Sequence, residues 1–377
     1  MTPLVIDIRA TDDPRDVVHR AVQALAEGKL VVFPLETVYV AAASALNERA
    51  VARLTSKVRN HDPGPLTLAV KSVEEVMDYV PQLPTLGRRL ARRCWPGPVT
   101  MQLVDAQPDS LVQRLPAGVR DAIAKEGEIR IRVPGHQLML AALRMLAGPL
   151  VIASARRLGG PDCVTAHELI ELLGGDVDVI FDAGKCRFGQ PSSLVRIAGS
   201  QLEVKRSGAI SEANLKRLSS WMAVLVCTGN TCRSPMAEAL LRKRLADKVG
   251  CSMNELEDHG AIVVSAGTSA TPGGRAAEEA IETMRERGLD LSAHESQPID
   301  ERLVTFADVI ITMTRSHRDA IVSCYPQAAS RTFVLSRGRT DVADPIGGPQ
   351  EQYRRCAEQI DAYLAEWVSE LDLDAET

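Results

Sequence analysis

The segment VLVCTGNTCRSPMAEAL, from Val224 to Leu240, constrains the fold of this chain more than any other stretch. An apolar, partly β-branched run ends at Cys227, and apolar residues recur at helical spacing from Ala237 onward. The two patterns predict a strand, a short loop and a helix in direct succession. Such a loop points backbone N–H groups inward, and the positive end of the helix dipole adds to them. The segment therefore predicts a phosphate-binding loop.

The spacing of Cys227 and Arg233 within this segment suits phosphoryl transfer. Inward N–H groups and the helix dipole stabilise a thiolate, so Cys227 is expected to act as a nucleophile. Arg233 offers a planar fork of donors for two phosphate oxygens. Ser234 is predicted to cap the helix, and Pro235 to lie in its first turn, where a missing N–H costs little.

The residues between the nucleophile and the arginine favour a tight, polar turn. Gly229 permits a positive φ, and Asn230 can hold such a turn through side-chain hydrogen bonds. We assign to the phosphate loop Thr228, Gly229, Asn230, Thr231, Cys232 and Ser234.

Phosphoryl transfer to a thiolate also needs an acid that protonates the leaving group. Asp344 is the best candidate, because Pro345 biases it toward an extended conformation. The pair Gly347-Gly348 marks a loop that can approach a neighbouring site.

This half of the chain resembles the low-molecular-weight protein-tyrosine-phosphatase family from about Met222 to the C-terminus. The resemblance rests on Cys227 to Ser234, Ser265-Ala266-Gly267, Ala307 to Met313 with His317 downstream, and Asp344-Pro345. It implies a parallel sheet flanked by helices, a phosphorylated protein as substrate, and neither a metal nor another cofactor. It also implies that Cys227 forms a cysteinyl-phosphate, that Arg233 binds the phosphate and that Ser234 supports the thiolate. Asp344 would be first the general acid and then the general base.

Two positions bear on the substrate. Tyrosine-directed members of the family commonly have isoleucine where this chain has Thr231, whereas the arginine-phosphatase branch resembles this chain in having threonine. Ile346 also replaces an aromatic residue that would stack on a phosphotyrosine ring. We favour phosphoarginine over phosphotyrosine. Arsenate reduction is a further alternative, but the cysteines of this half form no closely spaced pair that would resolve a cysteine adduct.

The chain is too long for one domain of this kind. It has 377 residues, of which the phosphatase resemblance covers only the last part, so we expect a first domain over 1–210, a linker over 211–221 and a phosphatase domain over 222–377. Eight cysteines without paired zinc spacing, one of which must stay reduced, favour the cytoplasm. No apolar run reaches membrane-spanning length, which excludes a membrane partner.

The sequence of the first half predicts a mixed α/β sheet. Asp13 is predicted to cap a helix that begins at Pro14 and stops at Gly28, followed by a buried strand that runs from Leu30 into a polar turn at Tyr39. Further strands separated by helices are predicted at Thr67–Val70, Val99–Val104, Ile129–Val133, Leu150–Ala153, Val179–Phe181 and Leu194–Ile197. We interpret the arginine cluster at 88, 89, 92 and 93 as a solvated helix face.

These residues resemble the threonylcarbamoyl-AMP synthase family, also called the YrdC-like fold, over roughly residues 10–210. The resemblance rests on Phe33-Pro34-x-Glu36-Thr37-Val38-Tyr39, Lys57-x-Arg59, Pro65-Leu66, Trp95-Pro96-Gly97-Pro98-x-Thr100, Arg132-Val133-Pro134, Ser154-Ala155 and Gly189-x-Pro191-Ser192-Ser193. It implies binding of ATP, L-threonine and bicarbonate with magnesium, in the service of tRNA modification. It implies a nucleotide site that includes Lys57, Arg59, Arg132, Ser154 and Ser192.

The first half also departs from that family. Leu35 replaces a threonine expected to meet the substrate, Arg156 replaces a neutral amide, and Glu128 stands where a threonine near the nucleotide is expected. A site loses much affinity when its hydrogen-bond partners vanish, so we infer a nucleotide- or anion-binding domain with lost or altered synthesis. Two alternatives stay open: a bifunctional protein with a working synthase, and a regulatory protein that binds nucleotide or double-stranded RNA. The mild positive charge of residues 1–210, a net +3 against −8 for the rest, leaves RNA open as a partner of the first half.

Overall fold

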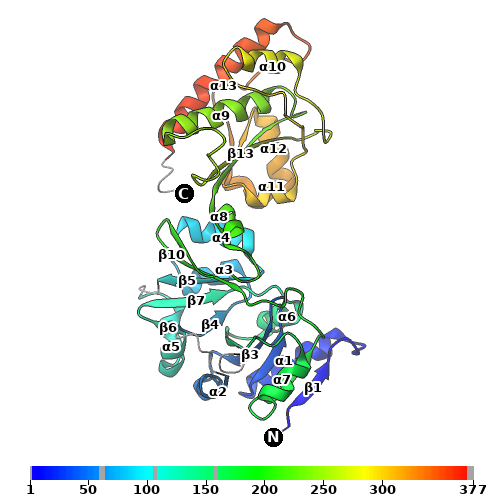
Figure 1. Ribbon diagram of the computed structural model, residues 1–377, viewed down its shortest axis with the longest axis vertical. Helices are drawn as coiled ribbons and strands as arrows, with labels where there is room; N and C mark the ends of the chain where they lie inside the picture. Colours follow the sequence, from blue (N-terminus) through cyan, green and yellow to red (C-terminus); the bar gives the residue numbers. More distant parts are fainter. Residues whose placement is uncertain (1, 59–63, 105–107, 156–159, 372–377) are drawn as a thin grey trace. The chain divides into compact units, whose positions relative to one another are not determined.

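The computed structural model describes residues 2–58, 64–104, 108–155 and 160–371, and it divides the chain into two compact units, Met1–Leu215 and Lys216–Thr377. Each unit has its own sheet covered by helices (Figure 1). The division falls inside helix α8 (Glu212–Ser219). Across the described part of the chain, no helix combines the length and the apolar character that a membrane crossing requires.

Eleven strands among the described residues of the first unit form one mixed sheet, in the order β1-β9-β2-β3-β8-β4-β7-β5-β10-β11, with β6 paired to β7. The strands are β1 (Leu4–Asp7), β2 (Val31–Pro34), β3 (Tyr39–Ser44), β4 (Thr67–Ala69), β5 (Val99–Val104), β6 (Ala124–Lys125), β7 (Glu128–Arg132), β8 (Leu150–Ser154), β9 (Val179–Asp182), β10 (Ser193–Ala198) and β11 (Gln201–Arg206). The helices are α1 (Pro14–Ala26), α2 (Glu48–Val58), α3 (Val73–Tyr79), α4 (Thr85–Cys94), the 3₁₀ turn η1 (Leu111–Arg114), α5 (Ala117–Ile123), α6 (Gln137–Met145) and α7 (Ala166–Leu173).

Local sequence signals account for helix α1. The side chain of Asp13 accepts a hydrogen bond from the backbone N–H of Arg15, and Pro14 is the first helical residue. Gly28 has a φ of 76°, a left-handed conformation that glycine adopts without steric cost. The predicted start and stop of this helix are therefore confirmed.

One expectation for the first unit is confirmed and one is wrong. The run from Leu30 to Tyr39 contains the buried strand β2, which ends at Pro34, followed by a turn, as predicted, and the chain then continues into the antiparallel strand β3. Arg89 does not lie on a solvated face: it is 1% exposed within α4, whereas Arg88 is exposed. The pattern of four nearby arginines in the sequence does not specify which of them lies on the buried side of α4.

The second unit has a parallel sheet, as the family resemblance implied, with four strands among the described residues in the order β13-β12-β14-β15. Its strands are β12 (Trp221–Cys227), β13 (Ala261–Gly267), β14 (Val309–Thr312) and β15 (Thr332–Val334). Its helices are α9 (Arg233–Val249), α10 (Glu278–Arg285), α11 (Glu301–Phe306), α12 (Arg315–Cys324), the 3₁₀ turn η2 (Pro326–Arg331) and α13 (Gln350–Glu370).

Strand β12 is buried on both faces, which explains its continuous apolar sequence. Trp221, Ala223 and Leu225 belong to the apolar cluster that includes residues of α9, α10 and α13. Met222, Val224 and Val226 belong to the cluster that includes residues of α11 and α12. Figure 1 shows these two sets of helices on opposite sides of the sheet.

Candidate active site

The strand order of the second unit marks the place of the site. Strand β12 pairs with β13 on one side and with β14 on the other. The connection that leaves β12 leads to β13, whereas the connection that leaves β14 leads to β15 on the opposite side. In parallel sheets, ligands bind outside the carboxyl ends of the strands at such a switch point. Cys227 is the last residue of β12, and helix α9 begins only six residues later at Arg233.

Two polar groups approach the sulfur of Cys227, whose side chain is buried. The backbone N–H of Asn230 donates to Sγ at 3.3 Å, and Ser234 Oγ lies 3.0 Å from Sγ. These contacts hold the sulfur at the floor of the loop.

Ser234 is not the helix cap that its sequence context predicted. The N-cap of α9 is Cys232, which makes no side-chain capping hydrogen bond. Ser234 lies inside the first turn, where its hydroxyl contacts Cys227 and the carbonyl oxygen of Ala266. The uncapped first turn leaves N–H groups for an anion in the loop.

Asn230 holds the loop in its turn. Its φ is 56°, a left-handed conformation that a non-glycine residue keeps only when other contacts support it. Its Nδ2 donates to Ser234 Oγ and Ser265 Oγ, both at 2.9 Å, and its Oδ1 accepts from the N–H of Gln297 at 2.8 Å. His294 Nε2 lies 2.7 Å from the Asn230 carbonyl oxygen. The loop is therefore preformed.

Sequence reasoning assigned no role to several of these supporting residues. Glu238, on α9, accepts from Ser265 Oγ at 2.6 Å, and burial raises the pKa of its carboxyl. Glu238, His294 and Gln297 lie 27, 64 and 67 positions from the residues they contact, so no local sequence pattern indicated these contacts.

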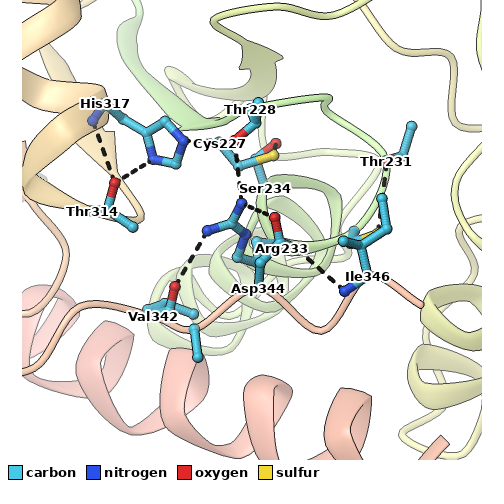
Figure 2. A network of polar contacts seen from close by, with 12 residues as sticks. Cys227, Thr228, Thr231, Arg233, Ser234, Thr314, His317, Val342, Asp344 and Ile346 are labelled. Atoms are coloured by element: carbon cyan, nitrogen blue, oxygen red, sulfur yellow. Dashed lines mark hydrogen bonds and ion pairs between the residues drawn. The ribbon is translucent and has the colours of Figure 1, made fainter. Parts of the chain in front are cut away.

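Arg233 reaches across the loop to the predicted acid (Figure 2). Its NH2 group donates to Asp344 Oδ2 at 2.5 Å and to Thr228 Oγ1 at 3.3 Å, and its NH1 group donates to the Val342 carbonyl oxygen at 3.3 Å. Its Nε is buried and has no hydrogen-bond partner among the described residues. A buried donor without a partner is costly, so this atom points to an anionic ligand.

The structure thus brings the acid and the arginine together, although 111 positions separate them in sequence. The side chain of Asp344 is 40% exposed, and its Oδ1 accepts from the N–H of Ile346 at 3.3 Å. Ile346 is 68% exposed. Asp344 therefore has access both to Arg233 and to a leaving group that arrives from solvent.

His317 is a further member of the site for which the sequence offered no role. Its Nε2 lies 2.9 Å from Thr228 Oγ1, and its Nδ1 lies 2.8 Å from Thr314 Oγ1 (Figure 2). Burial, followed by the charge of Arg233, lowers the pKa of His317. A neutral imidazole at this position holds the Thr228 hydroxyl, which accepts a hydrogen bond from Arg233.

Thr231 and Cys232 complete the loop. Thr231 Oγ1 lies 3.6 Å from the sulfur of Cys232, which also contacts the hydroxyl of Tyr353 at 3.7 Å. Burial raises the pKa of Cys232, so its thiol stays protonated more readily than that of an exposed cysteine. In the described residues, no group of three or more His, Cys, Asp or Glu side chains is arranged to hold a metal ion.

The first unit contains a cavity of about 330 Å³, which we call the Arg132 cavity. It brings together three of the residues predicted for a nucleotide site, Arg132, Ser154 and Ser192. Lys57 instead pairs with Asp176 at 3.1 Å, and Arg59 lies outside the described residues, as does Arg156. Other polar side chains that line the cavity are Thr37, Thr55, Thr67, Thr100, Asp121, Lys125, Arg130 and Arg206.

The interactions of this cavity differ from the expectation at two positions. Leu35 is 1% exposed and packs in the apolar core formed by β2, α1 and α6. A threonine at this position would therefore place its hydroxyl in that core and not in the Arg132 cavity. Glu128 pairs with Arg196 at 2.6 Å and accepts from Gln102 at 2.5 Å. Arg132 donates to Glu36 at 2.5 Å, and Thr100 and Ser192 share a hydrogen bond of 2.9 Å.

Two family models match separate parts of this chain, one in each half. Residues 23–208 match the YrdC-type family model described as "Telomere recombination", and residues 223–377 match the model described as "Low molecular weight phosphotyrosine protein phosphatase". A "Protein-arginine-phosphatase" of Bacillus subtilis is 36% identical over 155 residues, which cover 40% of this chain and 97% of the relative.

Threonylcarbamoyl-AMP synthases are among the relatives that match the first unit. A "Threonylcarbamoyl-AMP synthase" of Pyrococcus abyssi is 30% identical over 192 residues, 51% of this chain and 54% of the relative, so the chain spans about half of that protein. A "Putative threonylcarbamoyl-AMP synthase" of Mycobacterium tuberculosis is 33% identical over 192 residues, 51% of this chain and 83% of the relative. The chain therefore belongs to the YrdC-like, threonylcarbamoyl-AMP synthase family through its first unit and to the low-molecular-weight protein phosphatase family through its second.

Proposed function

We propose that this chain is a cysteine-dependent protein phosphatase that removes phosphate from phosphoarginine, with phosphotyrosine as the alternative substrate. The observation that carries the proposal is the buried Arg233 fork, whose Nε lacks a protein partner among the described residues, in the same loop as Cys227. Phosphate oxygens suit such a fork because they accept two parallel hydrogen bonds. The second unit needs no metal for this chemistry.

The reaction takes two steps. The sulfur of Cys227 forms a bond to phosphorus while the bond from phosphorus to the leaving nitrogen or oxygen breaks, and Asp344 gives its proton to the leaving atom. Asp344 then takes a proton from water, the water oxygen bonds to phosphorus, and the sulfur–phosphorus bond breaks to release phosphate. Arg233 and the loop N–H groups stabilise the charge in both transition states. An entering phosphate competes with Asp344 for Arg233, which frees the carboxyl for proton transfer.

Three observations support phosphoarginine over phosphotyrosine. A relative at 36% identity is named a protein-arginine-phosphatase. Thr231 supplies a hydroxyl in the loop, which can orient a polar guanidinium or a water. Ile346 is exposed beside Asp344 and offers no aromatic face to a phosphotyrosine ring.

The test compares phosphate release from a phosphoarginine protein and a phosphotyrosine peptide by the full chain. Cys227→Ala should abolish both activities. Thr231→Val, which removes only the hydroxyl at constant volume, should lower the preference for phosphoarginine about tenfold, whereas Thr231→Ser should retain it. Release that survives Cys227→Ala would overturn the mechanism, and equal preference in Thr231→Val and Thr231→Ser would overturn the role of the hydroxyl.

For the first unit we propose nucleotide or anion binding in the Arg132 cavity. Lys125, Arg130, Arg132 and Arg206 line it together with several hydroxyl groups, and Asp121 is the one carboxylate among its described lining residues. This set suits the phosphates of ATP, and a magnesium ion there would be held mainly by those phosphates with Asp121 nearby. ATP- and threonine-dependent pyrophosphate release would favour a working synthase for tRNA modification, and a saturable titration with double-stranded RNA would favour a regulatory RNA-binding role.

We also propose a reducing cytoplasm as the compartment. Within the part of the chain that the structure describes, which includes all eight cysteines, none is joined in a disulfide. Chemistry that depends on a reduced cysteine favours a compartment in which thiols stay reduced.

A further inference from the structure

A second cavity in the first unit, of about 620 Å³, lies apart from the residues assigned to nucleotide binding. We call it the Cys186 cavity, and it lies between the start of α1, the start of α6 and the loop 183–187. Strands β1, β9 and β2 are neighbours and parallel, so their carboxyl ends meet at this edge of the sheet. Loops beyond the carboxyl ends of parallel strands are the usual place for small ligands.

The body of the Cys186 cavity is apolar. Ile8, Val17 and Leu138 contribute to its lining, and so does Leu35, the residue that departs from the family pattern. Val17, Leu35 and Leu138 also belong to the core cluster of α1, β2 and α6, which keeps these walls rigid. A ligand with a compact hydrocarbon or aromatic body would replace water along this surface.

The loop that closes the cavity is held in place. The hydroxyl of Tyr39 donates to the Gly184 carbonyl oxygen at 2.8 Å and accepts from the N–H of Ala183 at 3.1 Å. The N–H of Cys186 donates to the Val164 carbonyl oxygen at 2.9 Å, and the N–H of Phe188 donates to the Glu36 carbonyl oxygen at 2.9 Å. The cavity is therefore preformed, which lowers the cost of binding.

The charges around the cavity favour an anion. Lys185 and Arg187 line it, both are exposed, and within the described ranges neither forms an ion pair with a carboxylate. Glu36 is the carboxylate of the lining, and it is already used by Arg132 and by the N–H of Gly135, at 2.5 and 3.0 Å. Among the described residues, two cations without ion-pair partners thus line the cavity together with one carboxylate that is already paired.

We propose that the Cys186 cavity binds a small organic anion, with a compact apolar body inside the cavity and a carboxylate at the mouth between Lys185 and Arg187. The Glu36–Arg132 ion pair joins this cavity to the Arg132 cavity, because each partner lines one of the two. An anion in the Cys186 cavity therefore acts close to the proposed nucleotide site without entering it.

The first test uses the full chain and three probes of equal chain length: octanoate, octanol and octylamine. Calorimetry should give one saturable octanoate site, with octanol at least about tenfold weaker and octylamine weaker still. The double variant Lys185→Glu/Arg187→Glu should weaken octanoate at least about tenfold and leave octanol unchanged. The matched control Arg114→Glu/Arg144→Glu makes the same change in net charge at two exposed arginines outside the cavity lining and should bind octanoate as before.

The second test locates the site. Octanoate should slow modification of Cys186 by a maleimide, measured peptide by peptide in a mass spectrometer, and leave the exposed Cys324 unaffected. Ala141→Phe should fill the cavity and abolish octanoate binding, while Ala141→Ser should retain it. The proposal is overturned by a chain without saturable octanoate binding, by octanol that binds as well as octanoate, or by charge reversal without effect. Melting temperatures of all variants distinguish lost binding from lost folding.

Discussion

At the scale of single residues, His317 explains how the loop presents Arg233. Thr228 Oγ1 accepts a hydrogen bond from Arg233, so its own hydroxyl donates to Nε2 of a neutral imidazole. The Nδ1–H group of His317 then donates to Thr314 Oγ1. Thr228 Oγ1 then keeps its lone pairs for the NH2 group of Arg233. Asp341 and Asp344 oppose the lowering of the His317 pKa, but burial outweighs them.

His317→Gln should therefore change both stability and activity. The pKa of His317 is lower in the folded than in the unfolded chain, so the unfolded chain binds more protons below about pH 6.5, and wild-type stability should fall as the pH drops through that value. The variant should lose less stability between pH 7.5 and 5.5, measured as melting temperature. Its kcat/KM should fall about fivefold because one hydrogen bond to Thr228 is weakened.

The control for this prediction is His259→Gln, since His259 is exposed and lies outside the site. It should keep the wild-type pH dependence and kcat/KM. A His317→Gln variant whose melting temperature falls with pH as steeply as that of the wild type would contradict the assigned protonation state.

At the scale of elements, the end of β13 supports the phosphate loop from behind. A Cβ atom on Gly267 would lie 2.4 Å from the Thr228 carbonyl oxygen and 2.9 Å from the Asn230 N atom. Backbone atoms at such short distances from the new Cβ atom could move aside only if the loop changed its conformation. Strand β13 and the loop after β12 therefore determine the position of Cys227 together.

Gly267→Ala should displace the loop and cost about 1–3 kcal/mol of stability, because overpacking forces backbone shifts. The expected readouts are a lower melting temperature and a fall in kcat/KM for phosphate release. Gly175→Ala, where a new Cβ would meet no atom within 4 Å, should leave both unchanged. Wild-type kinetics in Gly267→Ala would mean that the loop does not depend on this contact.

At the scale of the whole molecule, the second unit has the components of an independent domain. Its two apolar clusters consist of residues from 221 to 371, on the two faces of its own sheet. The residues to which we assign catalytic roles, from Cys227 to Asp344, also lie within one compact unit.

A chain of residues 211–377 alone should therefore fold and release phosphate. We expect kcat/KM within about threefold of the full chain on the same substrate, abolished by Cys227→Ala, because an independent core supplies the stability of the site. The measurements are circular dichroism and phosphate release. A shortened chain that folds but does not turn over would show that the first unit contributes to catalysis.

Much of the site could be predicted because its central part is local. Cys227, Asn230 and Arg233 lie within seven consecutive residues, and the buried strand before them and the helix after them have clear sequence patterns. The sequence identified Asp344 as the candidate acid but not its contact with Arg233, and it assigned no role to Glu238, His294 or Gln297. Those contacts span up to 111 positions, so they depend on how the elements pack.

The sequence by itself determined the two α/β units, the strand–loop–helix that contains Cys227, and the start and stop of helix α1, because short-range backbone and periodicity signals decide such features. The tertiary structure alone decided that Asp344 pairs with Arg233, that Arg89 is buried and that Leu35 packs in a core beside the Cys186 cavity. Burial and long-range hydrogen bonds arise only when distant elements come together, and side-chain identity along the chain does not specify which face of an element meets its neighbour.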